Sequence, residues 1–208
     1  MHDCIFAAHC TELVCDNSCP KFVETSYLLE RNGISDKSSV FNASPERIAT
    51  MSRILSESDG KLKVLAAEES TVATAELFTY CAICHNWSGS RLHCSVYNLK
   101  YSLYLEELKK SWSVKTEPET LEYMRIWTKS AKVLIISSMD YVHFGDFESQ
   151  TLLNILQERE GTGQTTIMIL PKPIKNRQNL PNDVTGGLVG KNSDFFRRLT
   201  MKLKEGAK

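Results

Sequence analysis

The sequence lacks any apolar run long enough to cross a membrane, and its first residues lack the basic and apolar regions of a secretory signal peptide. These two absences predict a cytoplasmic protein without a membrane partner. Internal repeats and low-complexity tracts are also absent. Neither sign of charge is in excess, because 25 Lys and Arg residues balance 25 Asp and Glu residues. At 208 residues, the chain has the length and composition of one globular domain with a small appendage.

The balanced charge is unevenly distributed along the chain. Residues 172–208 contain nine Lys or Arg residues and three acidic residues, which gives this end a net charge of +6. A basic end on a neutral protein indicates contact with nucleic acid or an acidic partner, although a solvated surface helix would have the same composition. The candidates for contact with single-stranded DNA or a neighbouring subunit are Arg197, Arg198, Lys202 and Lys204, within an expected helix at 194–204.

Two short apolar runs, at residues 133–136 and 166–170, predict strands that are covered on both faces. Two further strands are expected at residues 62–66 and 93–97. The helices expected among them cover residues 75–87, 102–112, a segment opened by Glu117-Pro118-Glu119, and 149–159. This alternation predicts an α/β fold, a three-layer parallel sheet with right-handed crossovers, over residues 61–208.

The residues before this domain divide into two further parts. Residues 1–34 are rich in cysteine and end in a helix that Pro20 opens and Gly33 closes. Residues 35–60 begin as a polar linker and continue as a helix that starts at Ser44-Pro45-Glu46. We therefore expect a small N-terminal module, a linker with one helix, and the α/β domain.

The loop after the first expected strand occupies the place of a phosphate-binding loop, whose pattern is G-x-x-x-x-G-K-[ST]. In such a loop the glycines let backbone amides wrap the phosphates, the lysine neutralises them and the hydroxyl holds magnesium. The corresponding segment here reads AEESTVAT, so only the final hydroxyl residue is retained. The positions of this vestigial nucleotide loop are Ala67, Val72, Ala73 and Thr74.

The strand at 133–136 also lacks the residues that an ATPase would have at its end. ATPases with a phosphate-binding loop end this strand in acidic residues that hold magnesium and activate water, whereas this chain has Ser137 and Ser138. These serines form a vestigial acidic pair. Together with the altered loop, they predict that the chain is not an enzyme and does not bind ATP as a cofactor.

Residues 61–200 resemble the AAA+ core of bacterial and phage replicative-helicase loaders of the DnaC/DnaI type, in the order and spacing of their elements. The segments that carry the resemblance are YSLYLEELKKSW, VLIISSMD, ESQTLLNILQERE, TTIMILP and FFRRL. The resemblance implies a RecA/AAA+-like core, a role in DNA replication and a replicative helicase or another AAA+ ATPase as partner. It also implies an arginine finger at Arg197 or Arg198 and a sensor position at Pro171 or Lys172.

Four cysteines lie within sixteen residues near the N-terminus, with His2 and His9 close to them in sequence. Cytosolic proteins seldom keep disulfides, and four thiols could close a tetrahedral zinc site. An iron–sulfur cluster and free thiols are the alternatives, since the spacing is not the paired C-x-x-C form. Loaders of the DnaI type carry an N-terminal zinc module, so the resemblance also favours zinc. The predicted ligands are Cys4, Cys10, Cys15 and Cys19.

A second cysteine pattern, Cys81-x-x-Cys84-His85, matches the attachment site of haem c. It lies inside an expected amphipathic helix, where Leu77, Cys81 and Cys84 share one face. We therefore expect small buried thiols. A hydrolytic site that uses His143 with Asp140 or Asp146, near Glu148, is a further alternative without a nucleophile or metal-ligand spacing to support it.

The sequence as a whole predicts a helicase-loader-like adaptor that binds a replicative helicase without hydrolysing ATP and is encoded by a phage or other mobile element. The first alternative is an antagonist that mimics the host loader. The second alternative is a zinc-containing regulator that binds DNA through its metal module and basic C-terminus.

Overall fold

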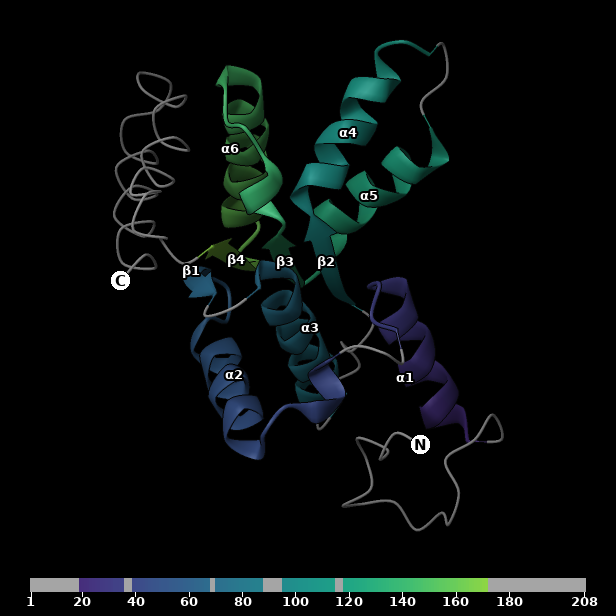
Figure 1. Ribbon diagram of the computed structural model, residues 1–208, viewed down its shortest axis with the longest axis vertical. Helices are drawn as coiled ribbons and strands as arrows, with labels where there is room; N and C mark the ends of the chain where they lie inside the picture. The colour runs from purple at the N-terminus through teal and green to yellow at the C-terminus, as the bar shows by residue number, and fades with distance from the viewer. Residues whose placement is uncertain (1–18, 36–38, 68–69, 88–94, 115–117, 172–208) are drawn as a thin grey trace.

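A computed structural model describes residues 19–35, 39–67, 70–87, 95–114 and 118–171 (Figure 1). The strands are β1 (Leu62–Ala67), β2 (Val96–Lys100), β3 (Val133–Ser137) and β4 (Thr165–Pro171). The α-helices are α1 (Pro20–Arg31), α2 (Pro45–Glu57), α3 (Thr71–Trp87), α4 (Tyr101–Ser111), α5 (Glu119–Ser130) and α6 (Asp146–Gly161). Two short 3-10 helices, η2 (Ser39–Asn42) and η4 (Met139–Tyr141), complete the described elements.

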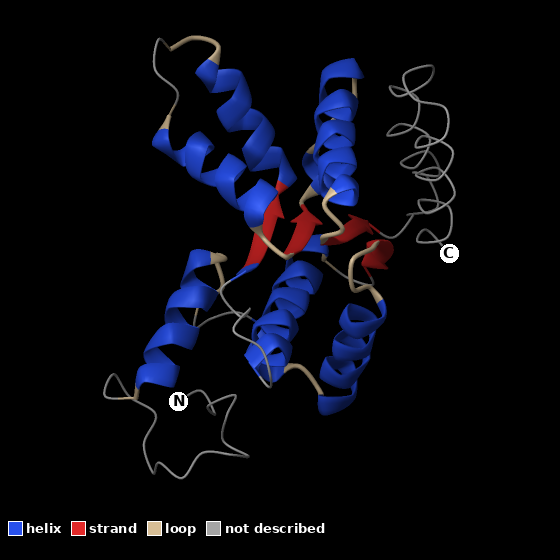
Figure 2. Ribbon diagram, turned by 180° about the vertical axis from the view of Figure 1, so that it is seen from behind, coloured by secondary structure: helices blue, strands red, loops and turns tan. Residues whose placement is uncertain are grey.

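The four described strands form one parallel sheet in the order β1-β4-β3-β2. Helices α1, α2 and α3 cover one face of this sheet, and α4, α5 and α6 cover the other (Figures 1 and 2). The predicted α/β class with a three-layer parallel sheet is confirmed, and this arrangement is compatible with a Rossmann-like or RecA-like core. Of the predicted zinc module at residues 1–34, residues 1–18 lie outside the described residues.

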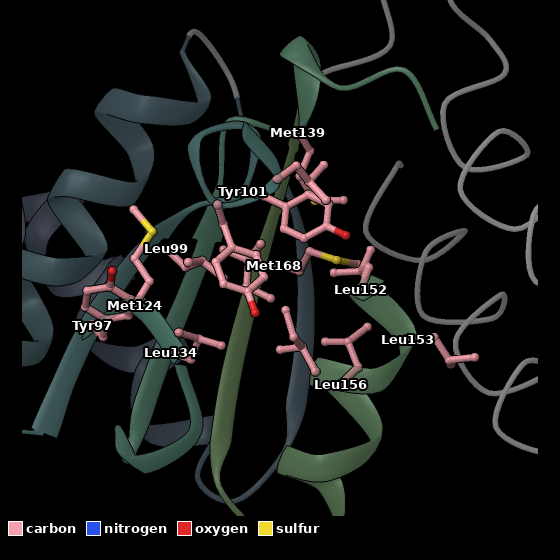
Figure 3. Packing of buried hydrophobic residues seen from close by; sticks show 14 of the residues in the cluster. Tyr97, Leu99, Tyr101, Met124, Leu134, Met139, Leu152, Leu153, Leu156 and Met168 are labelled. Carbon is pink, nitrogen blue, oxygen red and sulfur yellow. The ribbon is translucent and has the colours of Figure 1, made fainter. Parts of the chain in front are cut away.

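The apolar runs form strands because alternate side chains enter two separate cores. Leu134 and Ile136 of β3 point into the core beneath α4, α5 and α6, whereas Ile135 between them joins the core on the α3 side. Figure 3 shows the first core, where Tyr101 and Met168 lie among leucines from α6 and β3. A run that is apolar at every position therefore marks a strand with helices on both faces.

Several boundaries differ from the sequence prediction. The second strand covers Val96–Lys100 instead of 93–97, because Val96 pairs with Val133 and the strand continues through the polar Asn98, which is buried. Helix α3 begins at Thr71 instead of Ala75, and α6 runs from Asp146 instead of Ser149. The helix starts were missed because short polar and β-branched residues favour loops in isolation, whereas here capping by Ser70 and Glu148 extends both helices.

The outer edge of β2 is covered by the residue that ends α1. The Asn32 side chain accepts a hydrogen bond from the backbone N–H of Asn98 at 2.8 Å and donates to the carbonyl oxygen of Val96 at 3.4 Å. Arg31 also donates to the Val96 carbonyl at 3.1 Å, and its guanidinium lies 4.0 Å from the centre of the Trp127 ring. These contacts satisfy an edge that would otherwise be open to pairing with another chain. They also fix α1 against the sheet.

Candidate functional site at the carboxyl edge of the sheet

The carboxyl ends of the parallel strands bring together polar residues from three parts of the chain. In open α/β sheets ligands bind at this edge, where successive crossovers leave the sheet on opposite faces. Here α3, which follows β1, covers one face, whereas α4 and α6, which follow β2 and β3, cover the other (Figure 2). The change of face places the candidate site between the end of β1 and the end of β3, over β4.

The N-terminus of α3 is closed by side chains of the protein itself. Ser70 caps the helix, since its hydroxyl accepts from the backbone N–H of Ala73 at 3.3 Å and its carbonyl accepts from that of Thr74 at 3.0 Å. The hydroxyl of buried Thr71 donates to the Asp140 carboxylate at 2.8 Å. A carboxylate is thereby held close to the positive end of a helix, which is the place where a phosphate binds in nucleotide-binding loops.

The predicted vestigial nucleotide loop is thus largely helical. Ala67 is the last residue of β1, and Val72, Ala73 and Thr74 lie in the first turn of α3. Thr74, the retained hydroxyl residue, is 5% exposed, and its Oγ1 has no hydrogen-bond partner among the described residues. This hydroxyl is buried, whereas the motif would give it an open, magnesium-facing position.

Ser137 and Ser138, interpreted from the sequence as a vestigial acidic pair, lie at the end of β3. Ser137 is the last residue of the strand, and its buried hydroxyl donates to Oδ1 of Asn98 on β2 at 3.2 Å. Ser138 follows with φ 59°, a left-handed conformation that costs a residue other than glycine on the order of 1–2 kcal/mol. Such strain persists only where the surrounding structure enforces it.

Sequence reasoning missed the role of Asp140. Two residues after the serines, it brings a carboxylate to this edge, and that carboxylate accepts a hydrogen bond from Thr71. The two residues are 69 positions apart, so no local pattern could have joined them. The only sign of this role in the sequence is that an acidic residue follows a buried strand closely. A residue in that position lies at the carboxyl edge of a parallel sheet.

The hydrolytic alternative finds little support in this geometry. Glu148 is committed to structure, because it accepts from the backbone N–H of Gly145 at 3.1 Å and forms an ion pair with Lys109 at 2.8 Å. Partial burial opposes its ionisation, but these hydrogen bonds still hold its pKa below the ordinary value. Asp140 is engaged by Thr71. Within the described ranges, no group of three or more His, Cys, Asp or Glu residues is placed to hold a metal.

Cys19 and Cys81, the two cysteines whose side chains the structure describes, are free thiols. Cys19, which precedes α1, is half-buried, whereas Cys4, Cys10 and Cys15 lie outside the described residues. Cys81 is buried on α3, and burial raises its pKa to about 11 although a hydrogen bond with Ser52 lowers it. A thiol with this pKa is protonated and unreactive at neutral pH. The predicted buried thiol is confirmed for Cys81. The side chains of Cys84 and His85 are outside the description.

The remaining predicted contact residues lie beyond the described chain, which ends at Pro171 in β4. They are Lys172, Arg197, Arg198, Lys202 and Lys204. In the part that is described, every helix is too short or too polar to span a bilayer. No family model matches the chain, and neither a curated protein nor a solved structure matches it.

Proposed function

We propose that this chain is a helicase-loader-like adaptor in DNA replication, encoded by a phage or mobile element, that binds a replicative helicase without hydrolysing ATP. The observation that supports it best is the contact between Thr71 and Asp140. It holds an acidic side chain near the N-terminus of α3, which is where nucleotide-binding α/β folds bind a phosphate. The resemblance of residues 61–200 to helicase loaders supplies the partner class.

Binding of this kind would be stoichiometric. Hydrolysis of ATP requires a basic side chain that neutralises the phosphates, a bound magnesium ion and a positioned water molecule. Acidic side chains usually bind the magnesium ion and position the water. At the corresponding positions this chain has Ala73 and the two serines Ser137 and Ser138. The α/β domain would therefore hold its partner through surface contacts alone, with no cycle of nucleotide exchange.

The cysteine-rich segment would provide a second contact surface. The chemistry of its donors fits zinc, because four thiols within sixteen residues can complete a tetrahedral site without any other ligand. A segment with little regular apolar pattern would need that metal to fold. Elemental analysis of the purified chain should find about one equivalent of zinc. Iron in its place, or no metal, would contradict this assignment.

The basic C-terminal residues would contact single-stranded DNA or a neighbouring ATPase subunit. The paired change Arg197→Ala with Arg198→Ala distinguishes these targets. If the target is DNA, this change should weaken binding to all sequences alike and reduce its salt dependence. If the target is a mixed ATPase ring, it should reduce the partner's hydrolysis and leave DNA binding intact.

Co-purification with the replicative helicase of the native host tests the proposed function. We expect the helicase to be retained equally well with and without ATP, because no step of binding would use the nucleotide. A helicase-loading assay on single-stranded DNA then separates a loader, which promotes loading, from an antagonist, which blocks it. Retention of DNA without any helicase would instead support the zinc-containing regulator.

A further inference from the structure

Helix α6 is the outermost described helix of its layer, on the side of the sheet where β1 forms the edge. Figures 1 and 2 show α4 and α5 on one side of α6 and no further described helix on its other side. Helix α6 packs on β4, and β1 is the next strand outward. Among the described elements, therefore, no helix beyond α6 covers β1 on this face.

The side of α6 that faces away from α4 and α5 is nevertheless buried. Thr151 and Ile155 line the space that α6 shares with α4 and α5. Leu153 is two residues from each of them, which places it about 160° away around the helix axis. In Figure 3 its side chain points away from those of Leu152 and Leu156. It is only 2% exposed, so other atoms must cover it.

The neighbouring part of the sheet is buried in the same way. Val64 on the edge strand β1 is 4% exposed and Leu170 on β4 is 2% exposed, and both belong to the core on the α6 face. Apolar side chains lose their exposed surface only where other heavy atoms pack within contact distance. The structure contains a single chain, so the atoms that cover these residues belong to the same chain.

Length and position indicate that the C-terminal segment provides this cover. Outside the described residues the chain has residues 1–18, four internal stretches of at most seven residues, and residues 172–208. Residues 1–18 precede α1, which lies on the opposite face of the sheet. The internal stretches are too short to add a helix to the α6 layer. Residues 172–208 directly follow Pro171, which pairs with Ala67 of β1, so they begin beside the surface in question.

The direction of the chain also favours this face. From β2 to β3 and from β3 to β4 the chain moves across the sheet toward β1, and the connecting helices lie on the α6 face. Connections of this kind between parallel strands are almost always right-handed. A right-handed connection that continued past β4 in the same direction would place its helix on this face, next to α6.

The expected helix at 194–204 has the amphipathic pattern that such a place requires. Its four apolar side chains on one side fall within about 100° of the helix circumference. They are Phe195, Phe196, Leu199 and Leu203. Arg197 lies on the opposite side of the same helix. One side of the helix can therefore be buried while its basic side remains in solvent.

We propose that residues 172–208 fold back onto the α6 layer, where a helix at 194–204 packs its apolar side against Leu153, Val64 and Leu170. This helix completes the layer over β1. It also holds Arg197 in a fixed position that faces away from the sheet. The proposal rests on the burial and topology of the fold and requires neither helicase nor DNA, so its failure and the failure of the adaptor proposal are separate results.

Photo-cross-linking within the full chain tests this packing. The probe is p-benzoylphenylalanine in place of Gln157, which is half-buried and lies one turn after Leu153 on α6. On irradiation we expect a product of monomer mass in which mass spectrometry finds the probe joined to residues 194–204. The same probe in place of Thr151 is the matched control. Thr151 is also half-buried but faces α4 and α5, so its cross-links should go to those helices.

Two changes in the C-terminal segment make the test specific. Leu199→Ser should lower the yield of the cross-link from position 157 severalfold, because serine loses most of the free energy that leucine gains on burial. Arg197→Ser, on the opposite side of the expected helix, should leave the yield unchanged. The proposal is overturned if the probe at 157 gives no cross-link to residues 172–208 or joins residues 1–18 instead. A product of dimer mass would also overturn it and assign this surface to a second copy of the chain.

Discussion

Replacing Arg159 by leucine should lower the free energy of unfolding by about 3–5 kcal/mol, a loss typical of removing one member of a buried polar network. The guanidinium joins four parts of the fold. It donates to Thr166 Oγ1 at 2.8 Å and to the carbonyl oxygens of Thr128 and Thr165 at 2.9 and 2.7 Å, and it contacts Gln164 Oε1 at 3.1 Å. Urea unfolding followed by circular dichroism measures the loss.

A buried ion pair can often be replaced by apolar residues without loss, but Arg159 differs from that case. Its partners include backbone carbonyls, which no substitution can remove and which would remain buried without this donor. Arg159→Lys should recover only part of the stability, because an ammonium group cannot reproduce the planar fork of donors. Arg53→Leu is the control: this exposed side chain forms only an i,i+4 ion pair at 3.7 Å, worth less than about 0.5 kcal/mol. Equal losses at the two positions would show that Arg159 has no special structural role.

Asn32→Ala should lower the free energy of unfolding by about 1–3 kcal/mol, since it leaves the buried backbone N–H of Asn98 without its partner, whereas the Val96 carbonyl keeps its hydrogen bond from Arg31. The Asn32 amide satisfies the N–H of Asn98 and the carbonyl of Val96 at once, as a neighbouring strand would. Its loss should also loosen α1, because Asn32 joins the end of this helix to β2. Hydrogen exchange at the Asn98 amide, measured together with urea unfolding, reports both effects.

Asn32→Asp tests whether Asn32 stabilises the fold through its hydrogen bonds or only by filling space. Aspartate keeps the acceptor for the Asn98 N–H but loses the donors to Leu28 and Val96 and brings a buried negative charge. It should therefore destabilise the fold although its shape is nearly the same. Asn42→Ala, at an exposed position in η2, should change stability by less than about 0.5 kcal/mol. A tolerated aspartate at position 32 would contradict the proposed role of the amide.

The sheet itself could be predicted because the sequence pattern that specifies each strand is local. Apolar runs at β3 and β4 are too short for helices and too apolar for a surface strand, which is enough to predict a buried parallel sheet. The position of Ser137 and Ser138 at the end of β3 follows from the same pattern. The exact bounds of β2 did not follow, because the buried Asn98 interrupts its apolar sequence. The side-chain oxygen of Asn98 accepts from Ser137 and its backbone N–H donates to Asn32, and both contacts come from distant parts of the chain.

The features that depend on tertiary structure could not be predicted. An arginine near the end of an amphipathic helix is expected to face solvent. Arg159 is buried only because the ends of α5 and α6 and the start of β4 converge on it. The contact between Thr71 and Asp140 likewise requires the strand order β1-β4-β3, which no spacing in the sequence specifies.

Titration of Mg-ATP into the full-length chain, followed by calorimetry and by release of phosphate, tests the central claim most directly. The Thr71–Asp140 contact closes the N-terminus of α3, and position 73 offers no lysine, so we predict no saturable binding at millimolar ATP and no turnover above background. Phe78→Leu, a core change on the same helix, controls for effects on folding alone. Binding at micromolar ATP, or turnover that Thr74→Ala abolishes, would contradict the account.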